Sequence, residues 1–171
     1  MSESRVGTVY NVQPVPPDPA STDYLDFGPL RIGVEYRKVD PASLEAAYGD
    51  NAADMAEIVD NSPDGGFTDE GVSIHVIDAA DGHEYVRFDV FVDEPHYHYV
   101  DKAAGTNTLV HYDDAAFGPM MPWTLGQLAG PVAAMVERAG GTSLAASITP
   151  ELGTDVAAAV EAKLREIGEL P

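Results

Sequence analysis

A pair of alternating stretches in the middle of the chain constrains the fold most. "GVSIHVID" (Gly71 to Asp78) and "HEYVRFDVFVDE" (His83 to Glu94) flank "AADG", a pattern typical of a β-hairpin. The apolar side chains of both stretches have even numbers: Val72, Ile74, Val76, Val86, Phe88, Val90 and Val92. They share one face only if paired residue numbers add to an even sum, because a one-residue slip turns a whole strand over. The sequence therefore predicts a hairpin loop of about three or five residues rather than four.

The odd-numbered positions of the same hairpin carry polar side chains. His75, Arg87 and Asp89 would share this face with Ser73. A serine, a histidine and an aspartate are the components of a hydrolase triad, but the chain has no Gly-x-Ser-x-Gly sequence to expose a nucleophile. We therefore interpret these residues as a polar cross-strand network.

The segments around the hairpin predict a mixed domain of strands and helices. Strands are expected over Leu30–Val39 and over Thr106–Asp113. A helical stretch follows Asp40-Pro41, and the chain from Pro122 onward is helical in pattern. Because strands and helices are segregated along the chain, the α+β class is favoured. We expect an antiparallel sheet, built as a hairpin and meander, with helices packed on one face.

The beginning of the chain differs in composition from the rest. Prolines 14, 16, 17 and 19 favour an extended, polyproline-like segment. We expect residues 1–21 to form a Pro-rich N-terminal arm that is either disordered or lies across a neighbouring subunit of a homo-oligomer. Residues 22–171 are expected to form a single α+β domain.

The charge of the chain excludes several classes of partner. With 29 acidic and 9 basic residues, the net charge is −20, which repels nucleic acid and anionic membrane surfaces. No stretch approaches the ~18 consecutive apolar residues of a membrane span. The N-terminal sequence does not have the pattern of a secretory signal, so a cytoplasmic location is expected. Gly-rich phosphate-binding motifs are absent from the sequence, so no nucleotide cofactor is expected.

The stretch "EPHYHYVD" is the main candidate for chemistry. If the preceding strand continues past Pro95, Glu94, His96 and His98 share a face, on the side of the apolar core. Two imidazoles and one carboxylate form a facial triad that suits a divalent Fe, Mn or Zn ion and leaves positions open for water or substrate. The chain has no cysteine, so His, Asp and Glu would have to hold any metal ion.

The length of the following loop decides which further residues join this face. If "KAAG" is the whole loop, Asp101 pairs with Thr106, and His96 then lies opposite His111. The predicted metal ligands are in that case His96, His98, Glu94, His111 and Asp113. A loop one residue longer or shorter turns the last two away.

Three functional hypotheses remain open at this point. The favoured one is a small enzyme or ligand-binding protein with a His-x-His site, which binds a small molecule and a divalent metal ion. A second is a metal-free acid–base enzyme acting on a small apolar substrate. Its candidate catalytic residues are His96, His98, Tyr97 and Tyr99, the tyrosines lying on the opposite face of the strand. The third is a non-enzymatic interaction protein, a homo-oligomer in which the histidines are structural.

The span "GVSIHVIDAADGHEYVRFDVFVDEPHYHYVD", together with the later "MPWTL", resembles an uncharacterised bacterial family of short proteins with a Pro-His-Tyr-His-Tyr core. The resemblance covers residues 71–139. Such families are described only as domains of unknown function. The resemblance therefore implies that this stretch is the family's signature, and it implies no activity.

Overall fold

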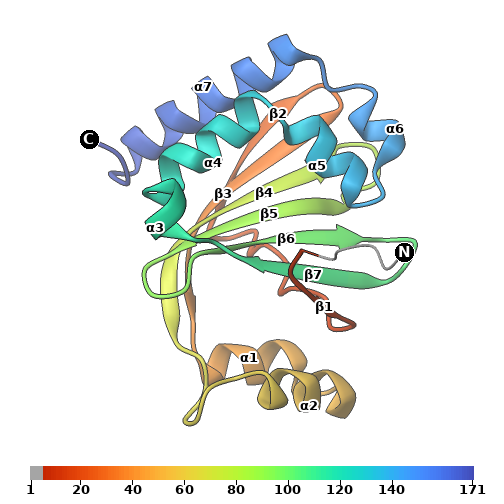
Figure 1. Cartoon of the computed structure of the whole chain (residues 1–171), viewed down its shortest axis with the longest axis vertical. Helices are drawn as coiled ribbons and strands as arrows, with labels where there is room; N and C mark the ends of the chain where they lie inside the picture. The colour runs from red at the N-terminus through yellow and green to blue at the C-terminus, as the bar shows by residue number, and fades with distance from the viewer. Residues whose placement is uncertain (1–5) are drawn as a thin grey trace.

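The computed structural model describes residues 6–171, in which seven strands form one antiparallel sheet (Figure 1). In chain order the strands are β1 (Thr8–Tyr10), β2 (Thr22–Phe27), β3 (Leu30–Val39), β4 (Asp69–Asp78), β5 (Glu84–Phe91), β6 (His96–Asp101) and β7 (Thr106–His111). Their order across the sheet is β1-β7-β6-β5-β4-β3-β2. From β2 to β7 each strand lies beside its neighbour in the chain, as expected for a meander.

Helices lie on both sides of this sheet within the same residues. They are α1 (Pro41–Tyr48), α2 (Ala52–Asp60), α3 (Asp114–Phe117), α4 (Met120–Ala129), α5 (Val132–Arg138), α6 (Thr142–Ala145) and α7 (Pro150–Glu166). The helices from α3 to α7 cover one face, whereas α1 and α2 stand on the other side (Figure 1). The α+β class, with helices packed on an antiparallel sheet, is confirmed. The prediction placed helices on one face only. The α1–α2 pair, which joins β3 to β4, lies on the other side of the sheet.

Two helices begin where the sequence predicts. The side chain of Asp40 accepts a hydrogen bond from the main-chain N–H of Ser43, and Pro41 occupies the first turn of α1. The hydroxyl of Thr149 accepts from the N–H of Leu152 at the start of α7. Such caps satisfy main-chain donors that have no partner within the helix.

The apolar core lies between the even-numbered face of the sheet and helices α4 to α7. Its fully buried members from the strands and the helices are Leu30, Ile32, Ile74, Val76, Val86, Phe88, Leu128, Val136, Val156, Val160 and Leu164. Burial of one such side chain contributes about 1.5–3 kcal/mol. Because side chains alternate along a strand, this layer also fixes which residues face α1 and α2.

The predicted parity of the hairpin is confirmed. Val72 pairs with Val90 and Val76 pairs with Val86, so the paired numbers add to an even sum. Five residues connect the end of β4 at Asp78 to the start of β5 at Glu84, but next to this loop Ile77 pairs with Glu84, an odd sum, so parity alone does not set the loop length. The pairing shifts by one residue between Val76 and Ile77, an irregularity that increases the local twist.

The condition that the preceding strand continues past Pro95 is not met. β5 ends at Phe91, the chain turns back over residues 92–95, and β6 begins at His96. Proline has no N–H for the strand ladder, and the main-chain N–H of Glu94 donates to Asp69 in the turn (2.8 Å). Val92, expected in the apolar set, is exposed.

This turn changes the face on which the histidines lie. His96 pairs with Asp89, and His98 pairs with Arg87, so both histidines lie on the odd-numbered, polar face of β5. The expectation that they share the side of the apolar core is therefore incorrect. The register of the next pair is as predicted for a four-residue loop, with His96 opposite His111.

The N-terminal arm, as far as it is described, packs on its own chain. β1 pairs with β7 at the edge of the sheet, and the main-chain carbonyl of Val15 accepts hydrogen bonds from Arg37 and Arg87. Residues 6–21 are therefore ordered against the sheet rather than free. Residues 1–5 of the predicted arm lie outside the described residues, and the division at residue 21 remains a prediction.

Candidate metal centre

The face of the sheet opposite the apolar core carries a row of buried polar side chains. Its members are Glu35, Arg37, Ser73, His75, Arg87, Asp89, His96, His98 and Asn107. They come from five adjacent strands, β3 to β7, and the antiparallel register sets them side by side. The predicted cross-strand network is present: His75 pairs with Arg87, and the hydroxyl of Ser73 donates to Asp89 Oδ1.

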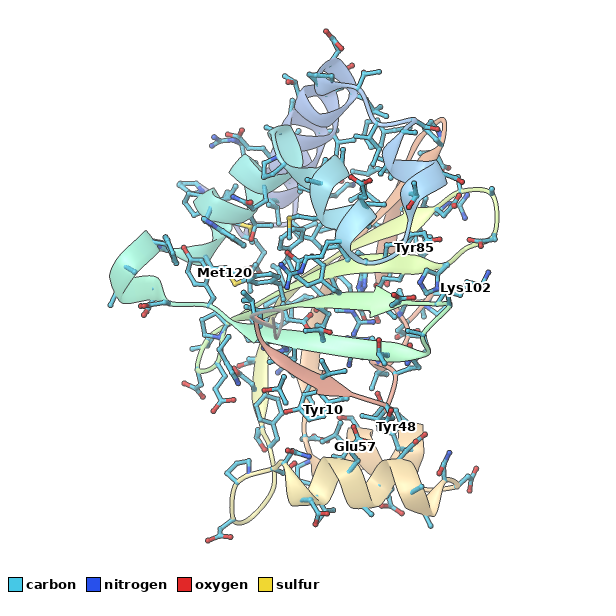
Figure 2. The ribbon with its side chains drawn as sticks, turned by 45° about the vertical axis from the view of Figure 1, so that its right-hand side comes forward. Tyr10, Tyr48, Glu57, Tyr85, Lys102 and Met120 are labelled. Carbon is cyan, nitrogen blue, oxygen red and sulfur yellow. The ribbon has the colours of Figure 1, made fainter. Side chains whose placement is uncertain are left out.

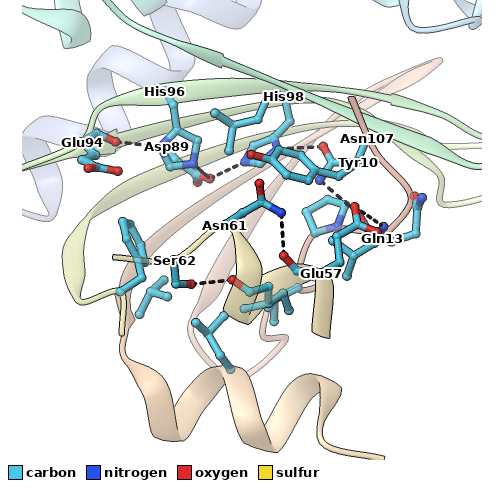
Figure 3. A pocket seen from close by; sticks show the side chains of 18 of the residues that line it. Tyr10, Gln13, Glu57, Asn61, Ser62, Asp89, Glu94, His96, His98 and Asn107 are labelled. Carbon is cyan, nitrogen blue, oxygen red and sulfur yellow. Dashed lines mark hydrogen bonds and ion pairs between the residues drawn. The ribbon is translucent and has the colours of Figure 1, made fainter. Parts of the chain in front are cut away.

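Asp89, His96 and His98 form the tightest cluster on this face. Asp89 Oδ2 lies 3.2 Å from Nε2 of His96 and 3.1 Å from Nε2 of His98. All three residues are buried, and one ligand atom from each lies within 4.8 Å of the others. Figure 3 shows the two imidazoles and the carboxylate converging from β5 and β6.

The outer nitrogens of the two imidazoles are held by oxygen atoms. Nδ1 of His96 lies 2.7 Å from the main-chain carbonyl of Glu94, an atom that can only accept a hydrogen bond. Nδ1 of His98 lies 2.8 Å from Oδ1 of Asn107, whose Nδ2 donates to the carbonyl of Val12 (3.3 Å). Both Nδ1 atoms therefore carry the proton. In a neutral ring this leaves Nε2 as a lone pair, aimed at Asp89.

Two opposing effects set the pKa values of Asp89, His96 and His98. Burial disfavours the charged form of each group, and attraction between the carboxylate and the imidazoles favours it. Burial raises the pKa of Asp89, but hydrogen bonds with His96 and His98 and the charges of His96 and Arg87 outweigh it and hold that pKa well below its usual range. Burial lowers the pKa of His96, but Asp89 more than compensates and the net pKa is raised. For His98 burial dominates, and the pKa is lowered. An ionised carboxylate and a neutral imidazole are the forms that bind metal ions.

A cavity of about 570 Å³ opens beside this cluster, between the polar face of the sheet and α1–α2. Asp89, His96 and His98 line it from the sheet side, and Leu44 and Ile58 line it from the two helices. This volume is in the range of small-molecule sites.

The N-terminal arm lines one side of the cavity. Hydrogen bonds join this arm to both helices, α1 and α2. Glu57 of α2 accepts from the main-chain N–H of Asn11 (2.8 Å), and the hydroxyl of Tyr48 donates to the carbonyl of Gln13 (2.6 Å). Figure 2 shows Tyr48 and Glu57 reaching from the helices toward Tyr10 of β1. Burial raises the pKa of Tyr48 to about 12, so its hydroxyl stays protonated.

The structure places the other predicted metal ligands less centrally. Glu94 lines the cavity, but its main-chain carbonyl, and not its carboxylate, is bonded to His96. The ring of His111 lines the cavity with its centre 6.4 Å from that of His96. The carboxylate of Asp113 accepts from the N–H of Ala116 as the cap of α3.

The two tyrosines predicted as catalytic lie on the helix-covered face of the sheet. The ring centres of Tyr97 and Trp123 are 5.2 Å apart, and Arg138 lies over the ring of Tyr99. Trp123 is half-buried and packs against the apolar core. Sequence reasoning missed Asp89 as a partner of the histidines, although it had placed Asp89 on a polar face.

A second buried network adjoins the cluster. Glu84 Oε1 accepts from Nε (3.0 Å) and Nη2 (2.7 Å) of Arg87, and Glu84 Oε2 contacts Nδ1 of His75. The other ring nitrogen of His75 lies 3.0 Å from Glu35. Burial raises the pKa of Glu84, but Arg87 and His75 outweigh it and lower the pKa to about 2.

The fold and the site define an α+β protein with a buried Asp-His-His cluster beside a cavity. A family model described as "Domain of unknown function (DUF7700)" matches residues 24–164, and the chain belongs to this family. The predicted resemblance to a family of unknown function is confirmed. Searches of curated proteins and of solved structures found no match. Within residues 6–171, no helix has the length and apolar character needed to cross a membrane.

Proposed function

We propose that the protein binds one divalent transition metal ion through Asp89, His96 and His98, and that the ion acts on a small molecule in the adjoining cavity. One observation carries this proposal: when both rings are neutral, the contacts at Nδ1 leave two imidazole lone pairs facing an oxygen of the Asp89 carboxylate. The Nδ1 protons are engaged with Glu94 and Asn107, which leaves two imidazole lone pairs and one carboxylate oxygen in contact. A cation at this point turns a repulsive arrangement into a stable one.

The surroundings of the three residues match those of known metal ligands. Metal-binding imidazoles donate their other N–H to a carbonyl or carboxylate oxygen, and metal-binding carboxylates are themselves hydrogen-bonded. His96 and His98 have such partners, and Ser73 donates to the carboxylate of Asp89. These contacts fix the tautomer and the orientation of each ring before any ion arrives.

The spacing of the donor atoms is also suitable. With bonds of about 2.1 Å, neighbouring ligand atoms lie about 3.0 Å apart around an octahedral ion and about 3.4 Å apart around a tetrahedral one. The separations of 3.1 and 3.2 Å from Asp89 Oδ2 to the two Nε2 atoms lie in this interval. Two histidines and one carboxylate suit Fe(II), Mn(II) or Zn(II) and leave positions free for a ligand.

The same cluster without an ion gives the competing hypothesis. Because Asp89 raises the pKa of His96, an imidazolium at His96 could donate to Asp89 and remove the repulsion. The cluster would then be an acid–base pair at the cavity, a metal-free catalyst. The two hypotheses differ in one measurable quantity, the metal content of the protein.

The test is metal analysis of protein purified without a histidine tag and dialysed against Fe(II), Mn(II) or Zn(II). We expect about one equivalent of bound ion for the wild type, as for any single site. The Asp89→Asn and His98→Gln variants should lose the ion. The His83→Gln variant is the matched control, because His83 bonds the carbonyl of Val100 outside the cluster.

The predicted ligand role of His111 is tested in the same series. His111→Gln should retain the ion if three residues suffice, and should lose part of the affinity if His111 is a fourth ligand. Less than about a tenth of an equivalent of every ion, with no uptake on titration, contradicts metal binding and leaves the acid–base pair.

A further inference from the structure

The cavity contains a cationic side chain that the proposed metal centre does not use. Arg87 pairs with His98 across β5 and β6, lines the cavity and is only 2% exposed. The Cα atoms of directly opposed residues on neighbouring strands are about 5 Å apart, so the side chain of Arg87 begins beside His98 of the metal centre.

Part of this guanidinium has no protein partner among residues 6–171. Of its nitrogens, Nε and Nη2 donate to Glu84, and Nη2 also donates to the carbonyl of Val15 (2.6 Å). Nη1 donates to none of the described residues. Among residues 6–171, the only side-chain polar atom that is both fully buried and without a hydrogen-bond partner is Oγ1 of Thr124. Because Nη1 of Arg87 has no partner either, it is not fully buried. It therefore borders open space, and the open space that Arg87 lines is the cavity.

A second guanidinium stands at the same end of the cavity. Nη1 and Nη2 of Arg37 each lie 3.2 Å from the carbonyl oxygen of Val15 that Arg87 also binds. The acids that neutralise the two arginines are Glu35 and Glu84, and neither is among the described residues that line the cavity. Asp89, which also attracts Arg87, does line the cavity, so a ligand would meet the guanidinium edges with Glu35 and Glu84 behind them and Asp89 beside them.

We propose that this end of the cavity binds the carboxylate of a small organic acid, with Nη1 of Arg87 as its donor. Nη1 borders the cavity and has no acceptor among residues 6–171, so a negatively charged ligand oxygen can accept a charge-assisted hydrogen bond from it. A carboxylate is the group that best matches a planar guanidinium. The inference rests on the proposed function for the role of the ion, but binding of the carboxylate by Arg87 does not require the ion.

The remaining walls specify the rest of the ligand. Leu44, Phe67, Phe91 and Leu109 give the cavity an apolar surface, so the ligand carries an aliphatic or aromatic body. The acids that line the cavity are Glu57, Asp60, Asp89 and Glu94, and they oppose any negative charge on the ligand beyond the one that Arg87 binds. The class is therefore a monocarboxylate with an apolar body, held with that body or its α-carbon near the ion.

The experiment compares carboxylic acids with their neutral amides by isothermal titration calorimetry on the full chain. Three pairs of increasing size are propanoate, 3-methylbutanoate and phenylacetate, each with the corresponding amide. Each pair is measured on chelator-treated and on Zn(II)-loaded protein. In the chelator-treated protein we expect at least one acid to bind about tenfold more tightly than its amide, because a charge-assisted hydrogen bond replaces a neutral one.

Variants assign this preference to Arg87. The double variant Glu84→Gln/Arg87→Gln removes both charges together, so no buried charge is left unpaired, and it should bind acid and amide equally. Glu161→Gln/Arg165→Gln, which removes an exposed ion pair on α7, is the control that should keep the preference. If the double variant does not fold, the comparison of acid with amide in the chelator-treated wild type still shows whether the cavity prefers a carboxylate.

Three results overturn the inference: no acid is preferred over its amide, the preference persists in the double variant, or it appears only after zinc is loaded. The last result would make the ion, and not Arg87, the partner of the carboxylate. The proposed metal function is tested separately. If the protein binds no metal ion, the chelator-treated protein should still prefer the acid over its amide.

Discussion

Replacing Glu84 with Gln tests the buried charge network from which Arg87 reaches the cavity. Glu84 bonds Arg87 and contacts His75, and its side chain is 11% exposed. Lowering its pKa from 4.5 to about 2 corresponds to about 3 kcal/mol, since each pKa unit is worth about 1.4 kcal/mol. We therefore expect Glu84→Gln to lower the free energy of unfolding at pH 7 by about 3 kcal/mol.

The sign of the pH dependence follows from the direction of this pKa change. A carboxyl group whose pKa is lower in the folded state stabilises the fold above its unfolded pKa, here 4.5. That stabilisation is lost as the pH falls toward the folded value of about 2. The wild type should thus lose its advantage over Glu84→Gln between these two values.

Urea denaturation followed by circular dichroism at several pH values measures both effects. Glu161→Gln is the matched control, because Glu161 forms an exposed pair with Arg165 and should change stability by less than about 1 kcal/mol. Two results would refute the role of Glu84. One is that Glu84→Gln lowers the free energy of unfolding at pH 7 no more than the control does. The other is that its difference in stability from the wild type does not decrease in acid.

Three further predictions concern the site, the core and the arm. Asn107→Leu removes the acceptor that orients His98, so metal affinity measured by competition with a chromophoric chelator should fall about tenfold, and unchanged affinity would contradict the role of this contact. Leu128→Ala empties a fully buried position and should lower the free energy of unfolding by about 2–5 kcal/mol, measured by urea denaturation. Its failure to do so would place α4 outside the core. Deletion of residues 1–17 removes β1 from the edge of β7 and leaves an unpaired strand, so light scattering should detect association that the full chain lacks, and an unchanged mass would show that β1 does not protect this edge.

Much of the sheet could be predicted because local patterns determine it. The even-numbered apolar positions of β4 and β5 gave the correct parity, since a half-buried strand alternates strictly. The register of β6 and β7 followed from the short loop after Asp101. In both cases the information lies within a few residues of the element that it describes.

The face of the histidines could not be predicted, because the turn before them depends on a distant residue. Between Phe91 and His98 the sequence offers Pro95, which can end a strand, but no Asn-Gly or Gly-rich signal that fixes where the chain reverses. In the structure the carboxylate of Asp69 accepts from the N–H groups of Asp93 (3.1 Å) and Glu94 (2.8 Å) and stabilises the turn. That contact spans more than 20 residues of sequence. Asp89 was missed for the same reason, since only the reversal brings it opposite His96.

The cavity could not be predicted from the sequence either. α1 and α2 have no buried residue, so they do not pack into the apolar core, and an apolar pattern on them does not show that they cover a cavity. Their position depends on contacts with the arm, such as the bond from Tyr48 to Gln13. Contacts between segments so far apart leave no periodic signal.

The most direct test of the central claim is the position of the ion in crystals of the tag-free protein equilibrated with Zn(II), located by anomalous scattering at the zinc edge. We expect one strong peak about 2.0–2.2 Å from Oδ2 of Asp89 and from Nε2 of His96 and His98. We also expect both Nδ1 atoms to keep their bonds to Glu94 and Asn107. A peak elsewhere, or none at this cluster, would contradict the central claim.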